Sequence, residues 1–291
     1  MSALEPHISI VLPTYNGARY IRQSIESCLS QTFSELELIV VDDGSVDQTS
    51  SIIQSFQDPR LRYLKFDCNQ GHIAALNYGF AQSRGKFLTW TSDDNYYHPQ
   101  ALARMLEVFK KDDPVDFVYT QYSLIDENGT RLRAGRIRQP RELDEDNCVG
   151  GCFLYRRDVY EQVGDFHSEA FLAEDYEYWL RVRQHFKMRM IVDDLYFYRV
   201  HADSLTGLHK DEKVQEQVER IRERFIPEYK KYFFRARKFH SLGEVGQARM
   251  AINQSLKGNL FYLSSWRLWF LLHLNPAVID KIRALKNRGT H

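Results

Sequence analysis

Two pairs of adjacent aspartates in the first hundred residues could do chemistry. Asp42-Asp43 and Asp93-Asp94 each follow a short run of apolar and β-branched residues that is typical of a buried strand. Adjacent carboxylates on a turn repel each other unless a cation lies beside them. At Asp93-Asp94 such oxygen ligands favour Mg²⁺ or Mn²⁺, with coordination positions left for phosphate oxygens. Taken alone, each pair is more typical of an ordinary polar turn, because Asp, Asn and Gly are common turn residues.

Polar residues follow each of the first four predicted strands, which span residues 8–12, 36–41, 61–66 and 87–91. The segments that follow are Pro13-Thr14-Tyr15-Asn16, Asp42-Asp43-Gly44-Ser45, Asn69-Gln70-Gly71 and Ser92-Asp93-Asp94-Asn95. In an open α/β sheet, ligands bind beyond the carboxyl ends of the strands, so we expect these segments to face one crevice. The chain has no GxGxxG or GxxxxGK(S/T) motif, which argues against NAD-dependent enzymes and P-loop ATPases. A nucleotidyltransferase would be expected to carry a glycine-rich loop after the first strand, where this chain has Pro13-Thr14-Tyr15-Asn16.

The elements that must position these residues form an alternating series. Short β-branched runs alternate with segments of helical period through the first half, which predicts an α/β fold with a mainly parallel sheet. Helices are predicted at 17–31, 47–56, 73–83, 99–111, 157–163 and 174–186, and further strands at 117–122, 151–155, 189–192 and 196–200. Asn128-Gly129 predicts a hairpin turn. Residues 131–149 are polar with weak periodicity and predict a long loop.

The last part of the chain has helical signals only. Helices are predicted at 212–232, 235–242, 245–257, 260–273 and 276–286. We therefore expect an α/β domain over residues 1–206 and an all-helical C-terminal region over residues 207–291. This region carries 17 Lys/Arg and 8 Asp/Glu, a net charge of +9, whereas residues 1–206 carry −9. Its aromatic side chains suit packing against the α/β domain or a second subunit, or contact with a membrane interface.

Composition excludes several classes of protein. With 291 residues, 43% hydrophobic and 27% charged, the chain can form a packed core, which excludes a disordered or low-complexity protein. Equal numbers of basic and acidic residues, 39 each, give no argument for nucleic acid binding. No CxxC pair occurs, so the four cysteines predict free thiols of a cytoplasmic protein. No secretory signal is expected, because the first residues lack a basic region and run straight into a strand-like segment. No transmembrane anchor is expected, because the longest apolar stretch, 261–274, is short and interrupted.

The motifs in combination closely resemble those of family 2 glycosyltransferases, which have the nucleotide-sugar-binding GT-A fold. The family's PTYN, VVDDGSxDxT, NxGxxxAxNxG, xDD and EDxxxWLR patterns correspond to Pro13–Asn16, Val40–Thr49, Asn69–Gly79, Asp93-Asp94 and Glu174–Arg181. The resemblance covers residues 8–206, and it makes them a GT-A catalytic domain. It implies transfer of a sugar from a nucleotide-sugar donor to a hydroxyl of a glycan or lipid-linked acceptor, as in cell-surface polysaccharide synthesis.

The resemblance also implies roles for individual residues. Asp94 would hold the Mn²⁺ or Mg²⁺ that bridges the donor diphosphate, and His201, in a YRxHxxS pattern, would be a further metal ligand. Asp175 would be the general base, with Glu174 as the competing candidate. The nucleotide would contact Pro13, Tyr15, Asn16, Asp43, Asn69, Asn77, Asp93 and Arg199. A hydrogen-bonded surface histidine remains the alternative for His201.

One base without a second nucleophile implies a single displacement, hence inversion at the anomeric carbon. Uridine is the favoured base because Asp43 could accept the imide proton of uracil, although guanine and thymine offer a comparable donor. The alternative function is a non-catalytic nucleotide-sugar-binding scaffold whose helical tail recruits partners. Tyr178 and Trp179 could stack on an acceptor sugar, although aromatic residues at helical spacing more often belong to the core. The sequence does not identify the sugar, the acceptor, the linkage or the oligomeric state.

Overall fold

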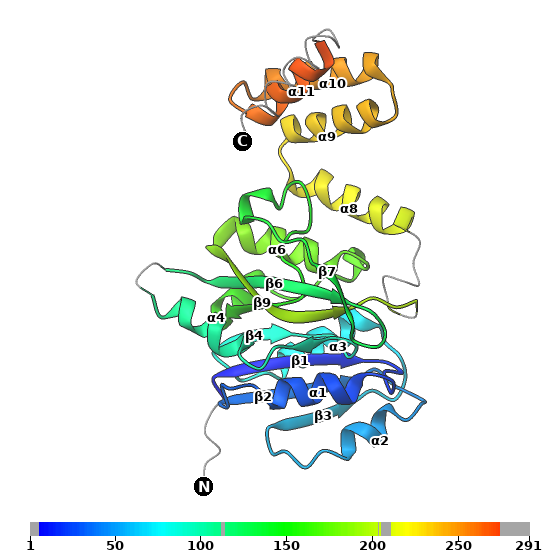
Figure 1. The fold of residues 1–291 in the computed structure, drawn as a ribbon, viewed down its shortest axis with the longest axis vertical. Helices are drawn as coiled ribbons and strands as arrows, with labels where there is room; N and C mark the ends of the chain where they lie inside the picture. The colour runs from blue at the N-terminus through cyan, green and yellow to red at the C-terminus, as the bar shows by residue number, and fades with distance from the viewer. Residues whose placement is uncertain (1–5, 112–113, 203, 205–210, 274–291) are drawn as a thin grey trace. The chain divides into compact units, whose positions relative to one another are not determined.

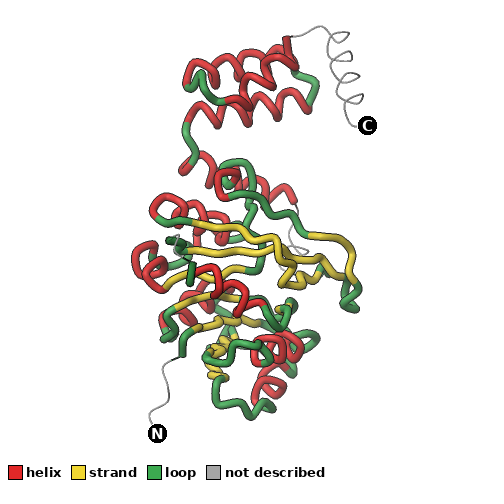
Figure 2. The backbone as a smooth tube through the Cα atoms, turned by 60° about the vertical axis from the view of Figure 1, so that its left-hand side comes forward, coloured by secondary structure: helices red, strands yellow, loops and turns green. Residues whose placement is uncertain are grey.

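The structure is a computed structural model that describes residues 6–111, 114–202, 204 and 211–273. The chain divides into two compact units, Met1–Val218 and Glu219–His291. Figure 2 shows strands throughout the first unit, whereas the described part of the second contains helices and turns. The predicted domain boundary between residues 206 and 207, and the predicted helix at 276–286, lie outside the described residues.

A nine-stranded mixed sheet forms the centre of the first unit (Figure 1). The strands are β1 (Ile8–Thr14), β2 (Leu36–Asp42), β3 (Leu61–Lys65), β4 (Phe87–Trp90), β5 (Tyr96–Tyr97), β6 (Phe117–Ile125), β7 (Arg131–Ala134), β8 (Phe153–Arg156) and β9 (Met188–Arg199). Their order is β3-β2-β1-β4-β8-β6-β9-β5, with β7 paired to β6. Strands β3, β2, β1 and β4 are parallel, so their carboxyl ends meet at one edge as predicted. Strand β8 runs antiparallel to both β4 and β6.

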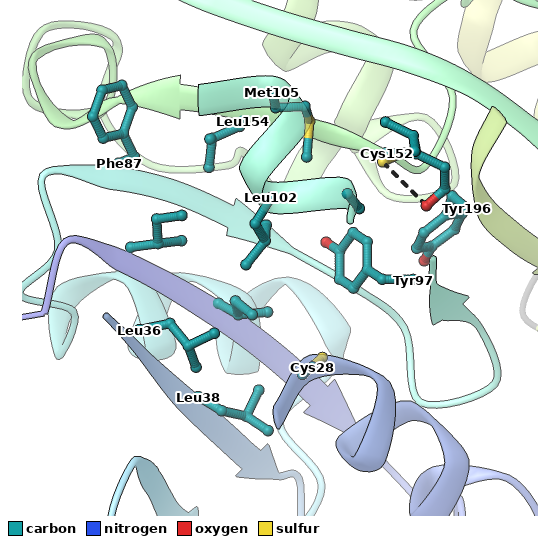
Figure 3. Packing of buried hydrophobic residues seen from close by; sticks show 14 of the residues in the cluster. Cys28, Leu36, Leu38, Phe87, Tyr97, Leu102, Met105, Cys152, Leu154 and Tyr196 are labelled. Carbon is teal, nitrogen blue, oxygen red and sulfur yellow. Dashed lines mark hydrogen bonds between the residues drawn. The ribbon is translucent and has the colours of Figure 1, made fainter. Parts of the chain in front are cut away.

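Helices cover both faces of this sheet. They are α1 (Ile21–Leu29), α2 (Thr49–Gln54), α3 (His72–Ala81), α4 (Ala101–Phe109), α5 (Arg157–Val163) and α6 (Glu174–His185), with short 3₁₀ turns at Pro140–Glu142 and Ser168–Ala170. Alternate residues of β2 enter different clusters: Leu38 packs with Cys28 of α1, whereas Ile39 packs with Ala75 of α3. Figure 3 shows the first cluster, in which residues of α1, α4 and the strands meet. Because β1 and β2 are buried on both faces, they appear in the sequence as continuous apolar runs.

Several predicted elements differ in the structure. The strands predicted at 189–192 and 196–200 are one strand, β9, which continues through Asp193 and Asp194 with a register irregularity against β6. The two aspartates interrupt the apolar pattern, but each is bonded: Asp193 pairs with Arg104, and Asp194 accepts a hydrogen bond from the Ser123 hydroxyl. The long loop predicted at 131–149 was partly wrong, because β7 completes the predicted Asn-Gly hairpin. The two-residue strand β5 was not predicted.

The C-terminal part contains helices α8 (Asp211–Phe225), α9 (Glu228–Ser241), α10 (Val245–Gly258) and α11 (Leu263–His273). The predicted single helix over 212–232 is wrong, because the chain breaks between α8 and α9 at Pro227. Proline disfavours helical geometry in the residue before it. Helix α9 then continues through residues 232–235, where a break was predicted. Helices α9, α10 and α11 share a small core around Phe233, Ile252 and Leu268. None of the helices in the described ranges has the length and apolarity that crossing a membrane requires.

The contact between α3 and β1 leaves no room for a side chain at Gly79. A Cβ atom there would lie 2.3 Å from Val11 Cγ1, within a fully packed interior. We predict that Gly79→Ala lowers the free energy of unfolding by about 1–3 kcal/mol, as overpacked cores do. Urea unfolding followed by circular dichroism measures this loss. Adding Val11→Ala should recover part of it, and strictly additive losses would rule out the clash as the cause.

Candidate active site

The loop after β2 is built around the two aspartates at residues 42 and 43. Asp42 is fully buried, and it accepts hydrogen bonds from the Ser45 amide, the Ser50 hydroxyl and the Tyr63 hydroxyl at 2.7–2.8 Å. Asp42 therefore builds the turn rather than facing a ligand. Asp43, the predicted nucleotide contact, also belongs to a defined loop. Its Oδ1 accepts the Gln70 amide at 2.6 Å, and its Oδ2 accepts the Gly71 amide at 2.8 Å.

Asp43 thus fixes the loop that precedes α3. The glycine that follows it is required there, because Gly44 has a φ of +76° and a Cβ would lie 2.7 Å from the backbone carbon of Cys68. Asn69, the predicted nucleotide contact on the same loop, is exposed. Each Asp43 oxygen keeps a second lone pair for a donor on a ligand. The loops after β2 and β3 therefore form one rigid border of the site.

The end of β1 forms a second border. Tyr15 is about half exposed, whereas Pro13 is buried within the strand end. Asn16 has a φ of 53°, and its side-chain oxygen accepts the Val46 amide at 3.0 Å. The backbone amide of Asn16 donates to Ser45 Oγ at 2.9 Å. Asn16 therefore joins the β1 loop to the β2 loop, and both Asn16 and Tyr15 are exposed.

The end of β4 supplies the Asp93-Asp94 pair. Asp93 Oδ2 accepts the Thr14 hydroxyl at 2.5 Å, and burial together with the negative charge of Asp94 raises the pKa of Asp93 to about 7. Asp94 Oδ2 lies 3.1 Å from His201 Nε2. Burial also raises the pKa of Asp94, although His201 opposes this shift. The structure thus brings together the two residues predicted to bind a metal, across 107 residues of chain.

Asp94 and His201 fit a divalent cation whose other ligands come from a substrate. Asp94 Oδ1 and His201 Nδ1 are buried and have no hydrogen-bond partner among the described residues. In the described ranges, no group of three His, Cys, Asp or Glu side chains could hold a metal ion. One carboxylate and one imidazole would leave most coordination positions to diphosphate oxygens and water, as Mg²⁺ sites that bind nucleotides do. The role of these two residues as ligands stays a prediction.

Arg199 lies in this site, but its donors point to protein oxygens. Its side chain is 2% exposed and donates to the carbonyl oxygens of Asp94, Asp126 and Glu127 and to Gln23 Oε1, at 2.7–3.1 Å. The guanidinium therefore holds the backbone of Asp94 in place. A direct contact with a diphosphate would need some of these hydrogen bonds to be released, so that predicted role stays untested.

The start of α6 supplies the second pair of acidic residues. Asp175 Oδ2 accepts the Asn147 side-chain amide at 2.7 Å, and Asp175 Oδ1 accepts the Tyr176 amide at 2.6 Å. Burial and the negative charge of Glu174 raise the pKa of Asp175 to about 6. Burial also raises the pKa of Glu174, and Glu174 Oε2 is buried without a hydrogen-bond partner in the described part of the chain. Asp175 can therefore take up a proton near pH 6, and Glu174 holds its proton more tightly than an ordinary glutamate does.

His72 connects these groups, and the sequence analysis missed it. It is the first residue of α3, and its Nε2 lies 3.7 Å from Glu174 Oε1. Burial lowers the pKa of His72, and the negative charges of Asp175, Asp43 and Asp94 oppose that shift. The imidazole is therefore close enough to feel carboxylates from three separate segments. The available signal was its position directly after Gly71, where a loop at the carboxyl edge of the sheet becomes a helix.

Three other residues that were predicted to contact a substrate contact the protein instead. Asn77 uses its whole amide on the backbone of Phe166, accepting from the amide and donating to the carbonyl at 2.9 Å each. Tyr178 and Trp179 are fully buried, with Trp179 packed edge-on against Phe117 and Phe153. Stacking of these two rings on an acceptor sugar was therefore wrong, and the core interpretation is confirmed. All four cysteines are free, with three of them buried.

Comparison with known proteins identifies the family. Residues 9–164, more than half of the chain, match the family described as glycosyl transferase family 2. The chain belongs to glycosyl transferase family 2. An uncharacterized glycosyltransferase of Rickettsia prowazekii is 33% identical over 216 residues, which cover 69% of this chain and 66% of that protein. A second, from Rickettsia felis, is 32% identical over 190 residues, 61% of this chain and 31% of that protein. The chain thus spans about one to two thirds of the length of these family 2 relatives.

Solved structures of similar fold support the architecture. S. aureus TarS 1–349 in complex with UDP-GlcNAc has a TM-score of 0.63 at 17% identity, covering 91% of this chain and 79% of that chain. Mannosyltransferase PcManGT from Pyrobaculum calidifontis, in complex with GDP-Man and Mn²⁺, has a TM-score of 0.53 at 16% identity, covering 94% and 71%. At these identities the likeness concerns the fold. The family 2 chain therefore has the predicted GT-A-like α/β sheet with flanking helices, followed by C-terminal helices.

The raised pKa of Asp175 predicts that this carboxylate destabilises the folded family 2 domain. A group that binds its proton more tightly when folded contributes stability that is full below its unfolded pKa, 3.8, and is lost as the pH rises through about 6. Asp175→Asn should therefore raise the free energy of unfolding at pH 7, by about 1–3 kcal/mol. Thermal unfolding between pH 4 and pH 7 measures this gain. Asp58→Asn is the opposite control, because Arg60 lowers the pKa of Asp58, and a Tm unchanged or lower in Asp175→Asn would contradict the sign.

Proposed function

We propose that this protein is a metal-dependent inverting glycosyltransferase that moves a sugar from a nucleotide-sugar donor to a hydroxyl of a glycan or lipid-linked acceptor. One observation carries the proposal: Asp94 Oδ2 lies 3.1 Å from His201 Nε2 at an edge of the sheet where the charges of Asp43, Asp94 and Asp175 all act on the pKa of His72. These three aspartates come from separate segments and have the three predicted roles of base contact, metal ligand and general base. Family membership and the donor-bound structures of similar fold support a nucleotide-sugar reaction of this kind.

The donor is most simply a UDP-sugar. The exposed ring of Tyr15 can cover a nucleobase at the end of β1, and Asp43 can accept a hydrogen bond from an N–H at its edge. Its carboxylate is held in one orientation by two backbone amides, so it would meet the base without reorganisation. A UDP-sugar and a GDP-sugar are bound in two structures of similar fold, TarS and PcManGT. Asp43 is compatible with either base, and uracil remains our proposal.

Asp94 and His201 are the proposed holders of Mn²⁺ or Mg²⁺. When bound, the cation would supply positive charge to the departing nucleoside diphosphate. The chain's own residues prepare this position: Arg199 fixes the Asp94 backbone, and Thr14 fixes Asp93 beside it. The free lone pairs on Asp94 Oδ1 and His201 Nδ1 give the site its capacity to bind a ligand.

Asp175 is the proposed general base. Asn147 and the Tyr176 amide orient its carboxylate, so that it can take the proton of an acceptor hydroxyl as the new bond forms. A pKa of about 6 leaves it ionised at neutral pH while making it more basic than an ordinary aspartate. With one base and no covalent nucleophile, the anomeric carbon is inverted in a single displacement. Glu174 is the second candidate, because its carboxyl group is also buried and adjacent.

We also propose a cytoplasmic location, at the inner face of a membrane, and a role in cell-surface polysaccharide synthesis. The four free cysteines suit a reducing compartment. A lipid-linked acceptor would bring the enzyme to a membrane surface, with the C-terminal helices as the part that meets the membrane or a second subunit. No feature of the described residues calls for a nucleic acid partner.

Metal-dependent nucleotide binding tests the donor site. Titration calorimetry with UDP, GDP and dTDP, each with Mn²⁺ and with EDTA, should show one nucleotide that binds only with the metal. Asp94→Ala should weaken this binding at least tenfold, because it removes the proposed ligand with the free oxygen. Asp193→Ala, which breaks a surface pair with Arg104, is the matched control and should bind as the wild type does. Equal binding with EDTA would contradict the metal role, and no nucleotide binding at all would contradict the proposed donor site.

Turnover variants test the base. Asp175→Asn should keep donor affinity and lose turnover by roughly 10²–10⁴, whereas Glu174→Gln should retain most of it. The wild-type kcat/KM should fall as the pH drops below about 6, because the base becomes protonated. The rate of product formation, measured between pH 5 and pH 8, gives both the turnover of the variants and the pH dependence of the wild type. The opposite order of the two variants would assign the role to Glu174, and full turnover in both would eliminate both carboxylates as the base.

A further inference from the structure

Helix α11 has two apolar faces, and only one of them is packed. Ser265, Leu268 and Leu272 are buried against α9 and α10. On another face, Leu263 is 71% exposed and Phe270, two turns later, is 48% exposed. Trp266 lies between them at the same helical spacing and is partly buried. Figure 1 shows α11 beside α9 and α10 in this helical unit.

The turn before α11 extends this exposed face. Leu260 is 62% exposed and Phe261 is 91% exposed, so the turn presents two large apolar side chains to solvent. Trp266 joins the turn to the helix, because its Nε1 donates to the Leu260 carbonyl at 2.7 Å and its ring lies 6.1 Å from that of Phe270. We call Leu260, Phe261, Leu263, Trp266 and Phe270 the apolar tip. Because this hydrogen bond fixes the turn against the helix, the exposed side chains form a defined surface.

The surroundings of the apolar tip are basic. Residues 228–273 contain eight Lys/Arg and two Asp/Glu, a net charge of +6, and both acidic residues precede Val245. Lys257, just before the turn, and Arg267, within α11, are exposed. Residues 245–273 therefore combine exposed Leu and Phe side chains and the partly buried Trp266 with positive charge only. This combination is typical of segments that lie on a membrane interface rather than of an exposed protein surface.

We propose that the apolar tip is a docking surface for a bilayer that contains anionic lipids. Phe261, Leu260 and Leu263 would enter the boundary between headgroups and acyl chains, where Trp266 finds both an apolar and a polar environment. Lys257 and Arg267 would lie against lipid phosphates, so binding depends on the negative charge of the leaflet. All residues of the apolar tip belong to the helical unit, so membrane docking does not depend on the proposed transferase activity.

Vesicle flotation of the full chain tests this surface. The wild type should float with phosphatidylcholine vesicles that contain about 30% phosphatidylglycerol, and much less with phosphatidylcholine alone. The double variant Phe261→Ser/Leu263→Ser should lower the partition coefficient at least tenfold, because it removes two inserting side chains. Met250→Ser, an exposed apolar residue on α10, is the matched control and should leave the partition unchanged. Lys257→Glu/Arg267→Glu should remove the preference for phosphatidylglycerol.

Two further measurements separate membrane binding from other uses of the surface. Vesicles with brominated acyl chains should quench tryptophan fluorescence, and Trp266→Phe should remove most of that quenching. Light scattering reports self-association, and unchanged circular dichroism shows that each variant is folded. Equal flotation of the wild type and the Phe261→Ser/Leu263→Ser variant would overturn the proposal. The proposal would also be overturned if the wild type were a dimer that does not bind vesicles and the variant were a monomer. The surface would then join two copies of the chain.

Discussion

The buried guanidinium of Arg199 is the interaction on which the arrangement of the site depends. It ties the Asp94 backbone at the end of β4 to the Asp126-Glu127 turn and to Gln23 of α1. Removing a buried charge that donates to several carbonyl oxygens takes a hydrogen bond from each of them at once, which costs more than the loss of one contact. The last residue of β9 thereby controls where the carboxylate after β4 points. Residues separated by more than a hundred positions act as one rigid support.

The same edge of the sheet concentrates negative charge in a poorly solvated space. Asp93, Asp94, Glu174 and Asp175 all have raised pKa values, and burial is the first cause for each. The nearby imidazoles of His72 and His201 offset this charge only partly, since burial lowers the pKa of His72. The folded protein therefore holds these groups in an arrangement that is unfavourable without a ligand. Such strain is expected where the surroundings are arranged for the charge distribution of a bound substrate.

The sequence predicted the parts of the fold that depend on local pattern. The parallel strands β1 to β4 and their following loops are apparent because buried strands and polar turns have distinct compositions. The continuity of β9 was hidden because Asp193 and Asp194 satisfy their charge through Arg104 and Ser123, which are distant in sequence. His72 was missed for a similar reason, since its position directly after Gly71 is a weak signal and the carboxylates around it come from distant segments. Pro227 was a local signal for a break, but the prediction wrongly continued one helix across it.

The anchoring of the loop after α5 has a consequence for how specificity can diversify. Asn77 of α3 holds this loop through the backbone amide and carbonyl of Phe166, and every residue type except proline supplies both groups. The position of the loop is therefore set by a side chain outside it, whereas its own side chains are not needed for that anchor. Substitutions at the exposed positions of the loop can change its surface while its backbone stays attached to α3, whereas Phe166 is buried and stacked on Tyr178. The framework and the variable surface are in this way under separate selection.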